Sequence, residues 1–396
     1  TVLESEPGVS KFDITLSVEE QNDSIECLIE YRTDLFKRET VGQMLNEFDL
    51  VLDVMTRSIE QPIDNIPWMS EQNETQILER YQSDKTAFPD IDVLSKWESQ
   101  VGKNSDRPCV QHGSQQLSFS QIDHWADQLS VKLADAGLKP GDVVGVYAEP
   151  TPLMVTAILS VLKTGCAFLP LLPDTPRNRC ELMLSSASCK VVIDCEGSYE
   201  QAGIVCIKPT ALSSEAPSRP LCQPVLNELP AYIMFTSGST GEPKPVVVNR
   251  GNLAAFVSAR EDFYPDPPKE LLLLQPFNFD VAIGNLFWTL CFGGCVHLKP
   301  RSLTRDPFLL LDAIQREKIT HLVLLPLLYE PLLSIATSDQ FASLTCVILG
   351  GEQMPSDLPK RHYALNPNAT IYNEYGPTET TVICAAHPAN DPSAFG

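Results

Sequence analysis

The sequence predicts an α/β fold in which helices cover both faces of a mostly parallel β-sheet. The first observation behind this prediction is a series of short apolar runs rich in β-branched residues, at 231–237, 271–277, 319–325, 344–350 and 369–375. The second is that helical patterns such as 306–318 separate several of these runs. Strands that alternate with helices favour right-handed crossovers and parallel pairing, which gather ligands where the strands end.

The other segments have patterns of their own. Residues 12–31 alternate apolar and polar positions across a turn-forming Gln-Asn-Asp-Ser, as two antiparallel strands do, and a helical pattern follows at 40–59. Residues from 61 to about 92 are polar and punctuated by proline, which marks a boundary. We therefore expect a first part at 1–70, a linker at 71–92 and a larger domain at 93–396. Within that domain we expect a helix at 117–137, a strand at 143–148 and a surface connection at 198–230.

The composition limits the classes of function. The formal net charge is −22, so a broad basic surface for nucleic acid is not expected and any polyanionic partner must be small. No apolar run is long enough to cross a membrane, and the first residues show no secretory signal. The 12 cysteines are scattered through apolar runs, which indicates reduced thiols and a cytoplasmic location. Cys291 and Cys295 lack partners at zinc spacing, and no role is assigned to the histidines, His112, His124, His297, His321, His362 and His387.

The first functional candidate is the loop Phe-Thr-Ser-Gly-Ser-Thr-Gly-Glu-Pro-Lys-Pro at 235–245. Its glycines let the backbone approach an anion, while its hydroxyls and lysine add donors and charge. A P-loop differs, because it needs Gly-Lys before Ser or Thr at the start of a helix. Taken alone, the loop could equally be a solvated linker. The residues expected to bind phosphate are Thr236, Ser237, Gly238, Ser239, Thr240, Gly241 and Lys244.

Four motifs resemble, in content and order, those of the adenylate-forming enzymes. They are this loop, Pro-Phe-Asn-Phe-Asp at 276–280, Leu-Gly-Gly-Glu at 349–352 and Asn-Glu-Tyr-Gly-Pro-Thr-Glu-Thr at 373–380. The last is similar in particular to adenylation domains of nonribosomal peptide synthetases, and 162–179 looks like an early motif of the family. The resemblance covers about residue 89 to the end and implies the large N-terminal subdomain of such an enzyme. Residues 12–70 resemble the closing segment of a condensation domain without its catalytic motif.

Such an enzyme activates a carboxylate by attack on the α-phosphate of ATP, releases pyrophosphate and passes the acyl group to the phosphopantetheine thiol of a carrier protein. The resemblance implies that the loop grips the β- and γ-phosphates, that Tyr375 stacks on adenine and that Asn373 meets the exocyclic amine. Thr378 and Glu379 are the catalytic candidates, Thr378 at the α-phosphate and Glu379 as the ligand of Mg²⁺. Gly350, Gly351, Glu352 and Glu374 complete the implied nucleotide site. The alternative for 373–380 is an ordinary strand and Gly-Pro turn.

Asp280 stands where this family places the partner of the substrate ammonium, just before a helical pattern. It is also a natural N-cap, and the two roles are compatible. A carboxylate that faces an ammonium favours an α-amino acid over a plain fatty or aryl acid. The other implied pocket positions are Val281, Gly284, Val323, Ile348, Gly350, Glu374, Val382 and Ile383.

The implied pocket positions favour a large substrate. Two glycines among aliphatic residues favour a long or wide cavity, with Glu374 as its one charged group. We expect a substrate such as ornithine or N5-acyl-N5-hydroxyornithine, as in fungal siderophore synthetases. If Glu374 points outward, the alternative is a large apolar amino acid.

Some positions depart from the family pattern, namely Leu172, Pro245, Arg250 and Ala282, and they leave the role of Lys244 open. The family's ribose-binding aspartate, hinge and lid with its catalytic lysine are expected after residue 396, so we expect this chain alone to bind substrates and to adenylate poorly. The alternative functions are an acyl-CoA or aryl-acid ligase and a non-catalytic nucleotide-binding or docking module. The expected partners are the amino acid and the carrier and condensation domains of the same synthetase, with neither nucleic acid nor membrane.

Overall fold

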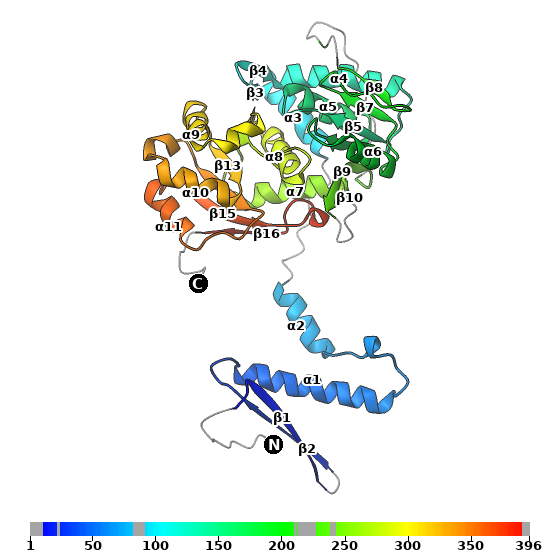
Figure 1. The fold of residues 1–396 in the computed structure, drawn as a ribbon, viewed down its shortest axis with the longest axis vertical. Coiled ribbons are helices and arrows are strands. Elements are labelled where there is room, and N and C mark those ends of the chain that lie inside the picture. Colours follow the sequence, from blue (N-terminus) through cyan, green and yellow to red (C-terminus); the bar gives the residue numbers. More distant parts are fainter. Residues whose placement is uncertain are drawn as a thin grey trace. The chain divides into compact units, whose positions relative to one another are not determined.

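A computed structural model of the chain describes residues 11–21, 24–81, 92–209, 212, 227–237 and 243–389. The chain divides into two compact units, residues 1–87 and 88–396 (Figure 1). The predicted boundary lies in the same region. Residues 82–91 of the predicted linker and residues 238–242 of the phosphate loop lie outside the described residues.

The first unit is a hairpin and helices. Strands β1 (Ile14–Gln21) and β2 (Ser24–Tyr31) pair antiparallel, and α1 (Arg38–Arg57), η1 (Ile63–Asn65) and α2 (Glu71–Tyr81) follow. The two strands and the first helix confirm the sequence prediction. Helix α2 occupies the first part of the predicted linker, because the hydroxyl of Ser70 accepts a hydrogen bond from the Asn73 N–H and caps the helix start. Among the described residues of this unit Val41 is the one buried apolar side chain, so most of its apolar residues, such as Trp68, lie at the surface.

The second unit contains two sheets, whereas the alternation of strands and helices by itself indicated one. The six-stranded sheet has the order β10-β9-β6-β5-β7-β8, and all its pairs are parallel except β9 with β10. Strand β8 lies inside 198–230, which was expected as a plain connection; it is only three residues long. The strands are β5 (Val143–Tyr147), β6 (Ala167–Leu171), β7 (Val191–Asp194), β8 (Val205–Ile207), β9 (Pro230–Ser237) and β10 (Pro243–Asn249); the helices before and between them are α4 (Phe119–Asp135), α5 (Pro152–Lys163) and α6 (Arg177–Ser186).

The eight-stranded sheet has the order β16-β15-β14-β13-β11-β12-β3-β4. Its six inner strands are parallel, and β4 and β16 pair antiparallel at the edges. The strands are β3 (Pro108–His112), β4 (Gln115–Ser118), β11 (Glu270–Leu273), β12 (Cys295–Leu298), β13 (His321–Leu324), β14 (Cys346–Gly350), β15 (Thr370–Tyr375) and β16 (Ala385–Pro388). Because β12 and β13 pair on opposite sides of β11, the direction of winding reverses at β11, which is where α/β sheets bind ligands.

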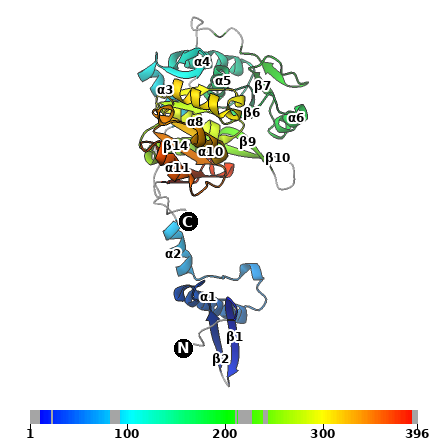
Figure 2. The ribbon, with the colours of Figure 1, turned by 60° about the vertical axis from the view of Figure 1, so that its left-hand side comes forward.

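Helices cover both faces of this sheet, as predicted. Alternate strand residues, such as Val323 and Ile348, join one core with α3, α7 and α8, whereas their neighbours Leu322 and Val347 join a second core with α9, α10 and α11. Figures 1 and 2 show α10 and α11 together beside this sheet. These helices are α3 (Val93–Asn104), α7 (Arg250–Phe263), α8 (Asp280–Cys291), α9 (Pro307–Arg316), α10 (Pro326–Ile335) and α11 (Leu358–Leu365), with 3-10 turns η2 (Arg301–Arg305), η3 (Ser338–Phe341) and η4 (Thr378–Thr380).

Two further sequence expectations concern thiols and membranes. All cysteines in the described part of the chain are free thiols, and most of them are buried. No helix within the described ranges has the length and apolar character that a membrane span requires.

Candidate functional site

The carboxyl ends of four neighbouring strands, β15, β14, β13 and β11, carry most of the predicted site residues. Strand β11 leads into the segment that ends at Asp280, at the start of α8. Val323 lies near the end of β13. Ile348 and Gly350 lie on β14, and Asn373, Glu374 and Tyr375 end β15. Residues from four separate stretches of sequence are therefore brought to one edge of the sheet.

Asp280 is buried at this edge, with 6% of its surface exposed. Phe279 is the N-cap of α8 and Asp280 its first residue, so the N-cap role considered for Asp280 is wrong. Burial raises the pKa of Asp280, although hydrogen bonds from the Thr378 hydroxyl and from the backbone N–H groups of Val281 and Val382 oppose that rise. Its Oδ2 atom has no hydrogen-bond partner among the described residues. A buried carboxylate oxygen in this state is suited to receive a cation.

Tyr232 is a residue that the sequence reading missed. It lies on β9, fully buried, and its hydroxyl has no hydrogen-bond partner in the described part of the chain. Burial raises its pKa, and so does the nearby charge of Asp280. The tyrosine stands four residues before Thr236 in an apolar strand, where its sequence context indicated only core packing.

The turn after β15 folds back tightly on the chain that follows it. A Cβ atom at Gly376 would lie 2.3 Å from the Cα atom of Ile383 and 2.5 Å from the carbonyl oxygen of Val382. Thr381 and Val382 have φ angles of 64° and 71°, which β-branched residues rarely adopt. Such backbone strain is often found at functional sites. The fold-back brings Val382 and Ile383, two predicted pocket positions, beside the Gly-Pro turn.

The described ends of the phosphate loop lie next to this turn. Thr236 and Lys244 are partners in the antiparallel pair β9–β10, and Ser237 ends β9. The 3-10 turn η4, which holds Thr378 and Glu379, packs against β10, and Figure 1 shows this red segment beside β10. The structure therefore brings strand β10, which carries Lys244, against the turn that contacts Asp280 through Thr378. The roles of Gly238, Ser239, Thr240 and Gly241 stay predictions, because these residues lie outside the described ranges.

The remaining nucleotide candidates differ in exposure. Tyr375 leaves 68% of its surface exposed, so its ring is open to a stacking partner. Glu379 and Glu352 are exposed, whereas Asn373 is half-buried. Gly351 has a φ of 81°, which explains the glycine after β14. A planar ring and carboxylates at one strand edge are compatible with a nucleotide and a hard metal ion.

The two pocket glycines do not leave open space by themselves. A Cβ atom at Gly284 would lie 2.7 Å from the Phe256 ring and 3.2 Å from Cγ1 of Val382. A Cβ atom at Gly350 would lie 2.9 Å from the carbonyl oxygen of Glu374. Gly284 therefore admits the ring of Phe256, and Gly350 admits the neighbouring strand, so a wide cavity does not follow from these glycines alone.

Glu374 is buried and paired within the protein, so it does not point outward into solvent, whereas the alternative of a large apolar substrate stays a prediction. Nη2 of Arg260 lies 2.8 Å from both of its carboxylate oxygens. The hydroxyl of Tyr264 donates a second hydrogen bond to the carboxylate. The pocket position expected to be a free negative charge is thus a neutral cluster. The sequence reading missed Arg260 and Tyr264, although an arginine within the apolar run of α7 was a signal for a buried charge.

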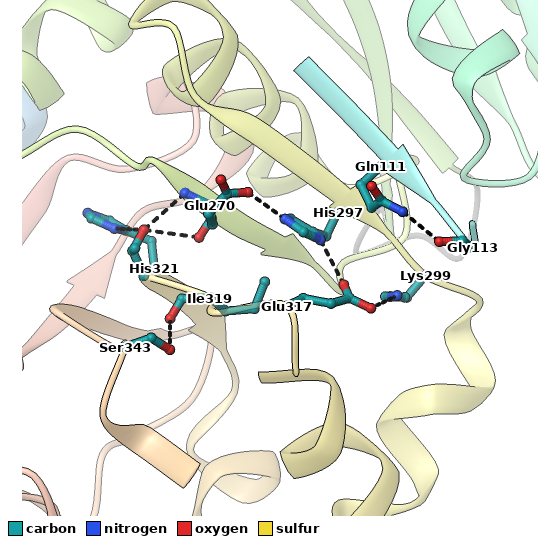
Figure 3. Close-up of polar contacts among 10 residues, drawn as sticks. Gln111, Gly113, Glu270, His297, Lys299, Glu317, Ile319, His321 and Ser343 are labelled. Atoms are coloured by element: carbon teal, nitrogen blue, oxygen red, sulfur yellow. Dashed lines mark hydrogen bonds and ion pairs between the residues drawn. The ribbon is translucent and has the colours of Figure 1, made fainter. Parts of the chain in front are cut away.

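His297, on β12, belongs to a separate network that includes Glu270 at the start of β11 and Glu317 at the end of α9 (Figure 3). Its Nε2 lies 2.6 Å from Glu270 and its Nδ1 lies 2.7 Å from Glu317, which also contacts Lys299. In the described part of the chain, Glu270, Cys295 and His297 place three potential metal-ligand atoms within 4.8 Å of one another. Since both ring nitrogens already contact carboxylates, hydrogen bonding accounts for the cluster, and we assign it a structural role.

The chain is similar to known proteins along both units. Residues 97–396 match the AMP-binding enzyme family, and residues 1–78 match the condensation domain family. Tyrocidine synthase 3 of Brevibacillus parabrevis is 29% identical over 402 residues, which cover 100% of this chain and 6% of that protein. The chain thus spans a small fraction of the length of this relative.

Solved structures agree in fold. The nonribosomal peptide synthetase FmoA3 (S1046A) superposes with a TM-score of 0.81 at 23% identity, over 95% of this chain and 41% of that one. The N-terminal subdomain of Klebsiella oxytoca NpsA, solved with 3-hydroxybenzoyl-AMSN, superposes with a TM-score of 0.68 at 21% identity, over 76% of this chain and 77% of that one. The predicted fold of the large N-terminal subdomain is confirmed. The chain belongs to the AMP-binding enzyme family, and the residues before its AMP-binding region are similar to the condensation domain family.

Proposed function

We propose that this chain is the amino-acid-activating part of a nonribosomal peptide synthetase module, which joins an α-amino acid to ATP as an aminoacyl adenylate and releases pyrophosphate. The observation that carries the proposal is the buried Asp280, whose Oδ2 atom has no partner among the described residues. An α-ammonium group placed there gains a charge-assisted hydrogen bond. A fatty or aryl acid leaves the carboxylate unpaired, which disfavours an acyl-CoA or aryl-acid ligase.

The other residues of the edge take positioning and electrostatic roles. The α-carboxylate of the substrate attacks the α-phosphate, and the Thr378 hydroxyl, next to Asp280, holds that phosphate beside the ammonium site. Lys244 and the loop that it closes bind the outer phosphates, and the exposed ring of Tyr375 stacks on adenine. Glu379 fits a Mg²⁺ ion, because it is an exposed carboxylate beside β10 and forms no ion pair with any described residue. Bound Mg²⁺ supplies charge that neutralises the phosphate oxygens.

For the substrate we propose a large amino acid, N5-acyl-N5-hydroxyornithine, for siderophore biosynthesis. The neutral pairing of Glu374 with Arg260 supports this acylated form over free ornithine, since no uncompensated negative charge remains there for a second ammonium. The acyl group would pass to the phosphopantetheine thiol of a cytoplasmic carrier protein in the same synthetase, next to its condensation domain. A binding preference for phenylalanine or leucine over ornithine derivatives would remove this substrate assignment.

Calorimetric titration with ATP, with and without Mg²⁺, tests the nucleotide part of the proposal. We expect ATP binding that Mg²⁺ strengthens and that weakens in Glu379→Gln when Mg²⁺ is present. A docking module without nucleotide chemistry would show no magnesium-dependent binding. The matched control is Asp262→Asn, which removes an exposed carboxylate of α7 outside the site and should leave nucleotide binding as it is in the wild type.

A further inference from the structure

Arg260 is a buried cation with unused hydrogen-bond donors. It is 1% exposed, and Nη2 is the nitrogen that reaches Glu374. Its Nε and Nη1 atoms have no hydrogen-bond partner among the described residues. A guanidinium offers five N–H donors and no acceptor, and buried donors without a partner are unfavourable. The unused donors therefore call for an acceptor from outside the described chain.

A second unused donor lies beside the first. The ring of Trp288 lies 4.6 Å from the Arg260 guanidinium carbon, and the Trp288 Nε1 atom has no partner in the described ranges either. The rings of Phe256 and Tyr264 lie 4.9 Å and 5.4 Å from the same carbon. Apolar rings strengthen a hydrogen bond made within them. The unused atoms of Arg260 and Trp288 are all donors, so a ligand that matches these two residues must supply acceptor oxygens.

The unused donors of Arg260 and Trp288 lie along the same face of α8 as Asp280, the proposed binding site of the substrate ammonium. Asp280, Gly284 and Trp288 are four residues apart and share a helix face, which places Trp288 about 12 Å along the axis from Asp280. The Phe256 ring contacts the Gly284 position on one side and Arg260 on the other. The Phe256 ring fills the space between Gly284 and Arg260, so a long substrate side chain that starts at Asp280 meets the donors of Arg260 and Trp288 only when this ring turns aside.

The charge of the cluster selects among acceptors. The positive charge of Arg260 is matched by Glu374, and Tyr264 uses its hydroxyl hydrogen on the same carboxylate. A carboxylate on the substrate would be repelled by the negative charge of Glu374, and an ammonium would be repelled by the positive charge of Arg260. A neutral carbonyl oxygen, as in an amide or a hydroxamate, satisfies the donors without adding charge.

We infer that Arg260 and Trp288 form a side-chain subsite that recognises a neutral carbonyl acceptor at the far end of the amino-acid substrate. The subsite rests on the proposed function, because it presupposes that the substrate ammonium lies at Asp280. It makes Arg260 a specificity-determining residue, held in place by Glu374.

The test uses the whole chain and three aminoacyl-sulfamoyladenosines, which mimic aminoacyl adenylates. Their side chains carry an N5-acyl amide, a free N5 ammonium, or an all-carbon chain as long as the amide. In the wild type we expect the amide to bind about tenfold or more tighter than the other two. Equal binding of the amide and the all-carbon chain would overturn the subsite.

Two variants assign the effect to the named donors. Trp288→Phe keeps a ring and removes the indole N–H, and we expect it to lose part of the preference for the amide. Removing Arg260 alone strands the Glu374 charge, so the second variant is the pair Arg260→Met with Glu374→Gln, checked for folding by circular dichroism. It should lose most of the preference for the amide and keep at most the part that the Trp288 N–H supplies. A full wild-type preference in the folded double variant would refute the assignment.

The same titrations separate the two proposals. If the wild type binds the all-carbon ligand well through its ammonium but gains nothing from the amide, the subsite fails and the proposed function stands. If none of the three ligands binds although Mg²⁺-ATP does, the proposed amino-acid activation fails and the subsite fails with it.

Discussion

Gly376→Ala tests the tight packing of the turn after β15. The added Cβ atom would lie 2.3 Å from the Ile383 Cα atom, whereas carbon atoms in contact are about 3.5 Å apart or more, so the two backbones must separate by about 1 Å. The nearest atoms belong to backbone, which cannot rotate away. Overpacking of this kind costs typically about 1–3 kcal/mol, and the separation moves Val382 and Ile383 away from the turn that holds Thr378.

The assay combines thermal unfolding with calorimetric binding of an aminoacyl-sulfamoyladenosine. We expect Gly376→Ala to lower the Tm by several degrees and to weaken binding about tenfold or more. The matched control is Gly102→Ala, because a Cβ atom there meets nothing within 4 Å and alanine favours the helix α3. A Gly376→Ala protein with wild-type Tm and affinity would refute the contact between the two backbones.

Further predictions concern strain, pH and metal binding. Thr381→Asn should raise the free energy of unfolding by up to about 1 kcal/mol in urea titrations, because asparagine tolerates the positive φ better than threonine does; a lower stability would contradict the strain. Burial lowers the pKa of His297, but its hydrogen bonds to Glu270 and Glu317 raise it more, so the net effect is a rise from 6.5. Burial raises the pKa of Glu317, but the hydrogen bonds from His297 and Lys299 outweigh burial and lower it from 4.5 to about 2. Because the pKa of His297 is raised, its contribution to stability is complete below pH 6.5 and is lost as the pH rises through the raised pKa. Because the pKa of Glu317 is lowered, its contribution is complete above pH 4.5 and is lost as the pH falls toward 2. Glu317→Gln should therefore destabilise the protein most between pH 4.5 and 6.5. A pH-independent effect, or an equal effect of Asp312→Asn in an exposed ion pair, would contradict this. Glu379→Gln should weaken ATP binding in Mg²⁺ and leave it unchanged in EDTA, and equal weakening in both would exclude a metal ligand.

Periodicity predicted the elements well because apolar side chains decide which segments are buried. The runs at 319–325, 344–350 and 369–375 became β13, β14 and β15, and the pattern at 306–318 became α9. The division into two sheets was not predictable from these local patterns, since strand order is set by long-range pairing. Strand β8 was missed because three residues carry too little periodic signal.

The site was predictable where a motif stands at a strand end and less so where side chains meet across elements. Asp280 and Thr378 lie far apart in sequence and adjacent in the fold, as the motifs required. The partners of Glu374 could not be foreseen, because Arg260 is 114 residues away on a helix whose packing only the fold determines. For the same reason the glycine at 284 indicated an opening, although the Phe256 ring occupies that space.

The central claim is that the Asp280 carboxylate binds the ammonium group of the substrate. One pair of ligands tests this claim most directly. The pair is an aminoacyl-sulfamoyladenosine and its deamino analogue, titrated calorimetrically into the wild type and Asp280→Asn. The wild type should prefer the amino form by about 10- to 100-fold, as a charge-assisted hydrogen bond provides, and Asp280→Asn should lose most of that preference. Equal binding of the two ligands to the wild type would contradict the account.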